Sequence, residues 1–439
     1  MNTKTTLILS VILLLMSGYY YFFEIKGTQE KVVKEEQEKK LLNVTTEQIN
    51  NFSYRNTIKS AEGSFVKKGS DWYLEKPVSY KGDNTNISSL LDSLVNAKYE
   101  EKIEGVKNPE DFGLSSPRIQ IGVKSTSGED EIKVGSESPT NTGFYLMKKN
   151  DPNVYLVPMV SFYALDKPLT ELRDRTLLDI EREKIKHIRI KNQNASFVLE
   201  KSGNDWMIKE PKLFKADTSK IEEWFDKLKN EKLSDFVSDN PQDIKLYGLG
   251  NPHILITVGE KPEQMDKTFM IGEQTGDYNY ARNNHSPSVF KISRSISEKF
   301  KFNLNDIRNK SLLSFDGSKA TRIEIESLAL NTILERDKDK NWKFVKKDEK
   351  SKATESDIGA MVDQLSSLNT EKFISKEKFS LGDRIINITI NVEGQNNPLK
   401  ITFGGKTPEN KEQIFCMKPD ITTEGYAINA SILSKVFPN

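Results

Sequence analysis

The chain of 439 residues is longer than one compact domain and suggests about three domains of roughly 150 residues each. Charged residues make up 29% and apolar residues 36%, a balance that fits a globular body and excludes a polytopic membrane protein. Because 65 Lys and Arg balance 64 Asp and Glu, no net field favours a polyanion, and we expect no nucleic-acid partner.

The N-terminus resembles a membrane anchor. Residues 5–23 carry no charge and consist largely of Leu, Ile and Val. About 20 apolar residues span a bilayer core, and the aromatic run Tyr19–Phe23 would lie at the far interface. A cleaved signal peptide with Leu7–Met16 as its apolar region is the alternative, but the aromatic run favours a retained anchor over residues 1–26.

The charges around this segment leave its orientation ambiguous. Lys4 precedes it and five lysines follow it, which would place the body in the cytoplasm by the positive-inside rule. Glutamates are mixed with those lysines, and the tail before the segment is only four residues long. Residues 27–46 are highly charged with little apolar periodicity, so we predict a stalk that cannot bury enough surface to fold.

Three phrases of the chain repeat, each around a tryptophan. KKGSDWYLEKP contains Trp72, EKSGNDWMIKEP contains Trp206 and RDKDKNWKFVKK contains Trp342, at spacings of 134 and 136 residues. This period indicates repeated whole domains rather than a solenoid of short units. We expect each tryptophan to be a buried anchor, whereas a repeated aromatic platform for sugar or peptide is the alternative.

An apolar stripe with helical spacing follows each phrase and predicts one central helix per copy. We expect the N-caps of these helices at Asn84, Asp217 and Thr354. The stripes are Ile87, Leu90, Leu91 and Leu94; Ile221, Trp224, Phe225 and Leu228; and Ile358, Met361, Val362 and Leu365.

Strands with period-two alternation come next, beginning at Ile119, Ile254 and Ile386. GLSSP and GLGNP precede the first two, whereas the third copy offers only SLGD around Gly382. Two short β-rich stretches and a terminal helix complete each copy. The fold class is therefore α+β: three tandem homologous β-rich modules with antiparallel sheets, each with one central and one terminal helix, behind an N-terminal transmembrane helix.

The phrases LRDRTLL (172–178) and IRNKSLL (307–313) mark the module boundaries. We predict modules over residues 47–178, 179–313 and 314–439, the last degenerate because it lacks this phrase. Arg173 and Arg308 lie in the two phrases. We expect them to tie a helix terminus to the next module's first strand rather than to bind a ligand.

The sequence ITFGGKTP (401–408) resembles the end of a phosphate-binding loop. Such a loop requires G-x-x-x-x-G-K-[ST] opening a helix, but Lys400 stands where the first glycine belongs and strand-like EQIFCMKP follows. The other copies align a strand ending at Gly135 and Gly272 with Gly404. We therefore predict a glycine turn that uses positive φ, and no nucleotide site.

Other chemical groups form no recognisable constellation. Cys416, the single cysteine, excludes an intrachain disulfide and lies in a strand pattern that favours simple packing. His187, His253 and His285 lack metal-ligand spacing, and no nucleophile–base motif stands out. We predict no catalytic, metal or cofactor-binding residue and no enzymatic activity.

The order of YYYFFE, a charged stalk, WYLEKP, a helix, DFGLSSP, KVGSESP, YLVP and LRDRTLL resembles a bacterial family catalogued only as a domain of unknown function. The resemblance covers essentially the whole chain and is strongest in the first two copies. It implies tandem modules behind one membrane anchor, a bacterial inner-membrane location with the body outside the cytoplasm, and association with ABC-type transporters of the gliding-motility-auxiliary class. No catalytic residue is implied.

These observations lead to one principal expectation and two alternatives. The principal expectation is a non-enzymatic, membrane-anchored extracytoplasmic scaffold, or an accessory, substrate-contacting subunit of an ABC-type transport system. The first alternative is a cell-surface carbohydrate- or peptide-binding repeat protein, which requires exposed aromatic side chains near the glycine turns. The second is an unrecognised envelope hydrolase, which requires a clustered acid–base pair in a pocket.

Overall fold

The computed structural model describes residues 39–433 except 329–330, 350, 352 and 422, together with Leu13, Met16, Ser17, Tyr19–Tyr21 and Gln37. The predicted anchor and most of the predicted stalk therefore fall largely outside the described residues. Within the described part of the chain, no helix combines the length and apolarity needed to cross a bilayer.

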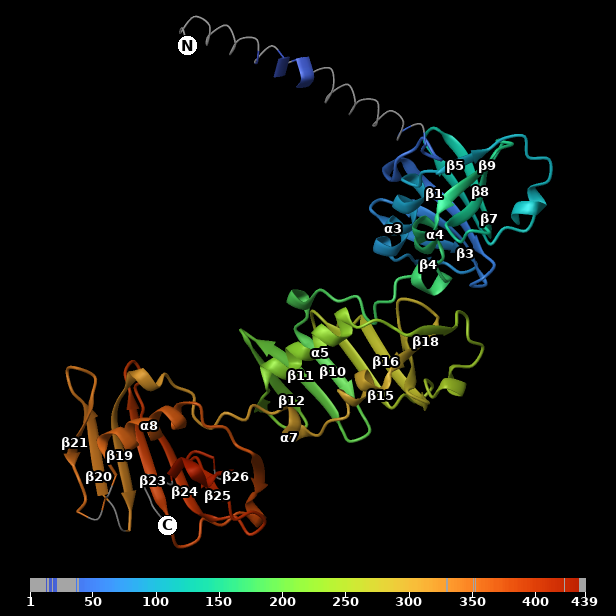
Figure 1. The fold of residues 1–439 in the computed structure, drawn as a ribbon. Coiled ribbons are helices and arrows are strands. Elements are labelled where there is room, and N and C mark those ends of the chain that lie inside the picture. Colours follow the sequence, from blue (N-terminus) through green and yellow to red (C-terminus); the bar gives the residue numbers. More distant parts are fainter. Residues whose placement is uncertain are drawn as a thin grey trace, which may run out of the picture. The chain divides into compact units, whose positions relative to one another are not determined.

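Three antiparallel sheets follow one another along the chain (Figure 1). Their strand orders are β4-β3-β2-β1-β6-β7-β8-β9-β5, β13-β12-β11-β10-β15-β16-β17-β18-β14 and β21-β20-β19-β23-β24-β25-β26-β22. The orders agree strand for strand, except that the described residues of the third sheet include no counterpart of the outermost β4 and β13. The prediction of three homologous β-rich modules is confirmed, whereas the residue-level boundaries stay predictions.

The strands occupy the following residues. The first sheet contains β1 (Ile49–Asn56), β2 (Ala61–Lys68), β3 (Asp71–Lys76), β4 (Tyr80–Lys81), β5 (Glu101–Ile103), β6 (Ile119–Ser125), β7 (Gly128–Glu137), β8 (Gly143–Lys148) and β9 (Val154–Pro158). The second contains β10 (His187–Lys191), β11 (Ser196–Ser202), β12 (Asp205–Glu210), β13 (Phe214–Lys215), β14 (Asp235–Ser238), β15 (Ile254–Gly259), β16 (Lys267–Thr275), β17 (Tyr278–Asn283) and β18 (Val289–Ser293). The third contains β19 (Ala320–Ser327), β20 (Asn331–Arg336), β21 (Trp342–Lys346), β22 (Lys372–Ser375), β23 (Ile386–Val392), β24 (Leu399–Lys406), β25 (Gln413–Met417) and β26 (Glu424–Asn429).

One longer helix accompanies each sheet: α3 (Asn84–Val95), α5 (Thr218–Asn230) and α8 (Glu355–Ser366). The short helices α4 (Met159–Leu165) and α6 (Arg294–Glu298) follow the first two sheets, α7 (Leu304–Ile307) comes next, and the 3-10 turn η9 (Ala430–Leu433) follows the third. Two further 3-10 turns, η3 (Pro109–Phe112) and η6 (Ile244–Tyr247), precede β6 and β15.

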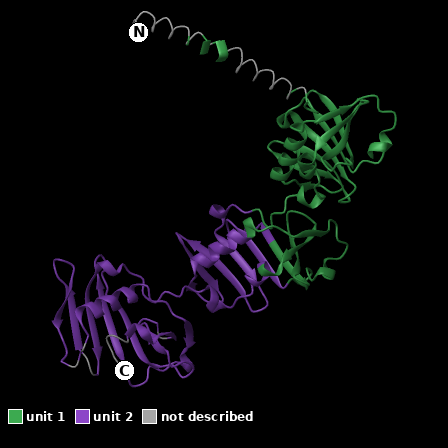
Figure 2. Cartoon of the chain, viewed as in Figure 1, with its two compact units in different colours: residues 1–179, 228–252, 269–295 green, residues 180–227, 253–268, 296–439 purple. Residues whose placement is uncertain are grey.

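The chain divides into two compact units (Figure 2). One comprises residues 1–179, 228–252 and 269–295, and the other comprises residues 180–227, 253–268 and 296–439. Each unit therefore combines one complete sheet with part of the second sheet.

The predicted helical stripes are confirmed, because all their side chains are buried against the sheets. Two of the expected N-caps also hold: Thr354 forms a capping box, and the Asp217 carboxylate accepts the Lys220 N–H. The expectation for Asn84 is wrong by one residue, since Asp83 caps α3. Asn84 instead accepts the Trp72 N–H at 2.9 Å, a tertiary contact that local sequence does not show.

The prediction that the charged stalk extends to residue 46 without packing is wrong at its end. Leu41, Leu42 and Val44 are buried in the core of the first sheet, although the surrounding segment is strongly charged. These three side chains form an apolar cluster at the end of the segment, so they can pack in spite of the charged composition around them.

The prediction that strands end at Gly135, Gly272 and Gly404 is wrong. These glycines lie inside β7, β16 and β24, at shifts of register. None of the three has positive φ. A Cβ on Gly135 would lie 2.1 Å from the Phe112 carbonyl oxygen, and on Gly404 it would lie 2.5 Å from that of Leu381. The glycine is thus required by close approach of another backbone segment rather than by a turn. Positive φ occurs at Gly113 and Gly248, where η3 and η6 end.

Adjacent glycines in GGKT provide a matched test of this explanation. Gly404→Ala should lower the free energy of unfolding by about 1–3 kcal/mol, because the new methyl group overlaps the Leu381 backbone. Gly405→Ala should be tolerated, since its Cβ would meet only the Leu381 oxygen at 3.7 Å, and Lys406→Ala should change stability by less than about 0.5 kcal/mol. Urea denaturation measures all three, and equal effects at Gly404 and Gly405 would contradict the close-approach account.

Candidate functional site

Short extended segments join successive sheets and pair with both of them. In one unit, Arg173 forms a β-bridge with Gly82, directly after β4, while Thr176 forms one with Lys232, which precedes β14. In the other unit, Arg308 and Ser311 form the equivalent bridges to Ala216 and Asn369. We call residues 172–178 and 307–313 the first and second junctions. Each pairs beside the edge strand of one sheet and with a residue that precedes an edge strand, β14 or β22, of the next, so it satisfies backbone groups that an open edge would expose.

A buried arginine lies at the centre of the first junction. The Arg173 guanidinium stacks between the rings of Tyr80 and Phe236, with its Cζ 4.4 and 3.5 Å from their centroids. Its Nη2 and Nη1 donate to the Asp239 carboxylate at 2.6 and 3.3 Å. Only 4% of the Arg173 side chain is exposed, and the ion pair and the two rings replace the hydration of its terminal nitrogens and faces, whereas its buried Nε has no hydrogen-bond partner among the described residues.

The second junction repeats this arrangement with different residues. The Arg308 Cζ lies 3.7 Å from the Phe214 centroid and 3.8 Å from that of Phe373. Both terminal nitrogens of Arg308 donate to the Glu424 carboxylate, Nη1 at 2.9 Å. Each of these two arginine clamps therefore takes one ring from the edge strand of the preceding sheet and one from the edge strand of the next.

The position of the arginines differs from the sequence-based expectation. Arg173 and Arg308 do not tie a helix terminus to the next module's first strand; they join the outermost strands of two sheets. The acceptors are 66 and 116 residues further along the chain, so the pairing depends on the strand order. A planar guanidinium suits this place, because its faces stack on rings while its edge binds a carboxylate.

A third copy of the junction precedes the first sheet and was missed in the sequence. Lys40 bridges Lys98 as Thr176 bridges Lys232, and the Tyr99 N–H donates to the Lys39 carbonyl at 3.1 Å. The signal was present, since KKLLNV aligns with RTLLDI and KSLLSF. Gln37 stands where the other copies have arginine, so this copy retains the pairing without the guanidinium.

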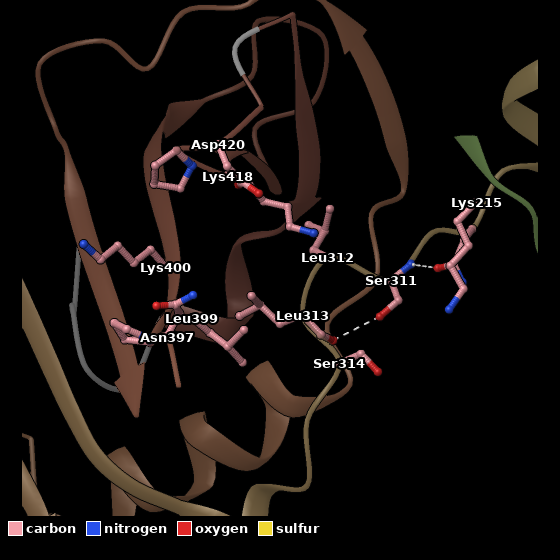
Figure 3. Close-up of a pocket in the computed structure, with 13 residues that line it drawn as sticks. Lys215, Ser311, Leu312, Leu313, Ser314, Asn397, Leu399, Lys400, Lys418 and Asp420 are labelled. Carbon is pink, nitrogen blue, oxygen red and sulfur yellow. Dashed lines mark hydrogen bonds between the residues drawn. The ribbon is translucent and has the colours of Figure 1, made fainter. Parts of the chain in front are cut away.

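A cavity of about 580 Å³ opens beside the second junction (Figure 3). Junction residues form one wall, and the β23–β24 loop and the segment after β25 form the other. In Figure 3 the Lys418 side chain extends toward Leu312, whereas Lys400 and Lys215 lie on opposite sides. The lining residues are Lys215, Asn309, Ser311, Leu312, Leu313, Ser314, Asn397, Pro398, Leu399, Lys400, Lys418, Pro419 and Asp420.

The repeat tryptophans are anchors of the modules, as predicted. Trp72, Trp206 and Trp342 are all buried, with at most 9% of the residue exposed. The Trp206 indole N–H donates to Glu222 at 3.1 Å, and the Arg336 guanidinium lies 4.8 Å from the Trp342 ring. No ring of the three is available as a platform for sugar or peptide.

The remaining sequence features lie apart from the junction cavity. Gly404, Gly405 and Lys406 continue β24, and no helix opens after them. Cys416 is buried in the third core, and burial raises the pKa of its thiol. His187 Nδ1 lies 3.8 Å from the Glu200 carboxylate, and the described residues contain no grouping of three or more His, Cys, Asp or Glu suited to a metal.

Comparison with known proteins gives a match to a family model, and several solved structures also match. Residues 72–213 and 206–381 match the model described as Domain of unknown function (DUF4340). The matches begin at Trp72 and Trp206, equivalent positions of two repeats, and each contains one junction. No curated protein matches the chain.

Two of these solved structures are sliding clamps. A DNA polymerase sliding clamp from Pseudomonas aeruginosa with ligand is 8% identical, with 91% of this chain and 97% of that chain covered and a TM-score of 0.15. The DNA polymerase III subunit beta from Pseudomonas aeruginosa is 9% identical, with 87% and 92% covered and a TM-score of 0.15. Scores this low support no statement about the fold or function of this chain.

Removing the guanidinium of the second junction should weaken it strongly. Arg308→Ala leaves the Glu424 carboxylate, 15% exposed, without its partner, and we expect a loss of about 3–5 kcal/mol. Arg384→Ala is the matched control, because Arg384 is exposed in the same compact unit and should shift stability by less than about 0.5 kcal/mol. Urea denaturation with limited proteolysis at residues 307–313 would show both effects. Comparable losses in the two variants would argue against the clamp.

The first junction should also respond to alkaline pH. Burial raises the pKa of Tyr80 to about 12 from 10.0, although the neighbouring Arg173 lowers it. A raised phenol pKa favours the neutral folded form, so this contribution to stability is complete below pH 10 and is lost as the pH rises through about 12. Tyr80→Phe should lose less stability than the wild type over this range in urea denaturation. The pKa of Tyr54 is raised similarly and stays in both proteins, so an identical loss would show that Tyr80 does not contribute.

Proposed function

Because the chain belongs to the DUF4340 family, whose description assigns no activity, we propose its function from its architecture: a non-enzymatic scaffold that holds three β-rich modules in series. Its place is outside the cytoplasm, attached to the bacterial inner membrane by the N-terminal segment. Its role is that of an accessory, substrate-contacting subunit of an ABC-type transport system.

The repeated junction is the observation that carries the scaffold role. Both arginine clamps, with their four aromatic rings and two carboxylates, are used to join one sheet to the next. Linked domains move against each other by default when their interface is small and polar. A buried ion pair between stacked rings opposes that motion within each unit. Binding surfaces on neighbouring modules would then act at a high effective concentration toward one partner.

The membrane location and the transport role rest on the sequence. The uncharged run over residues 5–23 supports an anchor, and the phrases from WYLEKP to LRDRTLL support the transporter-associated family. The alternative of a sugar- or peptide-binding array loses its basis, since the three repeat tryptophans are buried.

Affinity purification tests the partner. The full chain, tagged at its C-terminus and extracted from membranes in a mild detergent, should recover membrane and ATP-binding subunits of a transporter. Arg308→Ala should recover less of them than the exposed Arg384→Ala, because the modules are no longer held together. Recovery of the same proteins with an unrelated single-span anchor fused to the tag would overturn the assignment.

Protease accessibility tests the location. In spheroplasts, added protease should degrade the body of the chain while a cytoplasmic marker stays intact. Protection of the body until the membrane is permeabilised would place it in the cytoplasm, as the charges flanking the N-terminal segment would suggest.

A further inference from the structure

The second junction has a cavity beside it, whereas hydrogen bonds close the equivalent place at the first junction. At the first junction, the Asn283 side chain donates to the Leu177 carbonyl at 3.0 Å, and the Asp179 N–H donates to His285 Nε2 at 3.4 Å. These contacts fasten the segment after β17 to the junction.

The equivalent residues of the third module do not form these contacts among the described residues. Gly272 and Gly404 are equivalent, and the residues before them are Ile271 and Phe403. Ile271 pairs with Ala281 and Phe403 pairs with Cys416, so Ala281 and Cys416 are equivalent too. Lys418 therefore stands at the place of Asn283, and Asp420 at that of His285. The described residues show no hydrogen bond from either side chain to the second junction, and the space between the segments is the cavity.

The lining of this cavity is cationic. It contains three lysines and one carboxylate, Asp420. Lys215 is paired with Asp205 at 2.9 Å, but no ion pair engages Lys400 or Lys418 among the described residues. Lys418 is half-buried at the cavity wall, so an anion in the cavity could form a charge-assisted hydrogen bond with its ammonium.

The lining is also partly apolar. Leu399, Pro398 and Pro419 contribute carbon surface to the cavity, whereas Leu312 and Leu313 are only 4% and 3% exposed and pack mainly into the core. The volume lies in the range of sites for small organic molecules, which combine an apolar wall with a few polar groups. An inorganic ion would use the charge and leave the apolar wall in contact with water.

We propose that this cavity binds a small amphiphilic anion, with a phosphate or carboxylate group at Lys418 and an apolar body against Leu399, Pro398 and Pro419. The proposal does not depend on the transport role. The anionic group could belong to a free metabolite or to the headgroup of a lipid, since both present the same chemistry to the lysines.

Calorimetric titration of the full chain in nanodiscs of zwitterionic lipid, with empty nanodiscs as reference, tests the site. Phenyl phosphate and benzoate should bind, whereas inorganic phosphate and phenyl glucoside should bind at least about tenfold more weakly, because each lacks one of the two features. Lys418→Gln should weaken phenyl phosphate binding about tenfold, the effect of one charge-assisted hydrogen bond. Lys411→Gln is the control, since Lys411 is exposed and does not line the cavity.

A double variant supplies an independent arm. Lys418→Asn with Asp420→His restores the residues that close the first junction, so it should abolish binding while raising resistance to proteolysis at residues 307–313. If the natural ligand is a lipid headgroup, replacing the zwitterionic lipid of the nanodiscs by anionic lipid should weaken the apparent binding of phenyl phosphate. If it is a free metabolite, the anionic lipid should leave phenyl phosphate binding unchanged. Equal binding of inorganic phosphate, equal binding of phenyl glucoside, or full binding by the Lys418→Gln variant would each overturn the proposal.

Discussion

A guanidinium buried between two aromatic rings is the interaction on which the joining of the modules depends. A charge removed from water is stable only when a partner replaces its hydration, and here a carboxylate meets the edge of the guanidinium while the rings cover its faces. Arg173 and Arg308 fulfil this with different acceptors: Asp239, which directly follows β14, and Glu424 in β26. The same geometry is thus reached twice although the sequences around it differ.

The clamps lie where sheets would otherwise expose their edges. β4 and β13 are the outermost strands of the first two sheets, and the junctions pair with the residues that follow them. Among the described residues, which omit 350 and 352, the third sheet shows no equivalent strand, and the Phe344 N–H donates to the Glu355 side chain at 3.3 Å. A carboxylate from α8 therefore satisfies part of the edge that a strand covers in the other modules, which also disfavours pairing with another chain.

Differences between the copies are concentrated at the junctions, while the sheets remain alike. Before the first sheet, Gln37 stands where the other copies have arginine. Lys102 also stands in place of the clamp rings Phe236 and Phe373, because the three residues pair with equivalent partners in their sheets, namely Tyr155, Phe290 and Tyr426. Between the first and second modules, the junction is closed by Asn283. Between the second and third, the same position carries Lys418 and a cavity. A repeated frame with variable junctions lets one copy acquire a binding site without loss of the fold.

The sequence by itself determined the repeat, the three central helices and the burial of Trp72, Trp206 and Trp342, because periodicity and composition are local signals. It also excluded a nucleotide loop at GGKT. Only the tertiary structure decided the reason for Gly404, the third junction around Leu41 and the partners of Arg173 and Arg308. Gly404 is required because a Cβ there would clash with the Leu381 backbone, the segment at Leu41 pairs at a sheet edge, and Arg173 pairs with a carboxylate 66 residues away. Each of these contacts depends on strand order, which no local sequence pattern encodes. The cavity at Lys418 belongs to the same class, since it arises from contacts that the neighbouring copy makes and this copy does not.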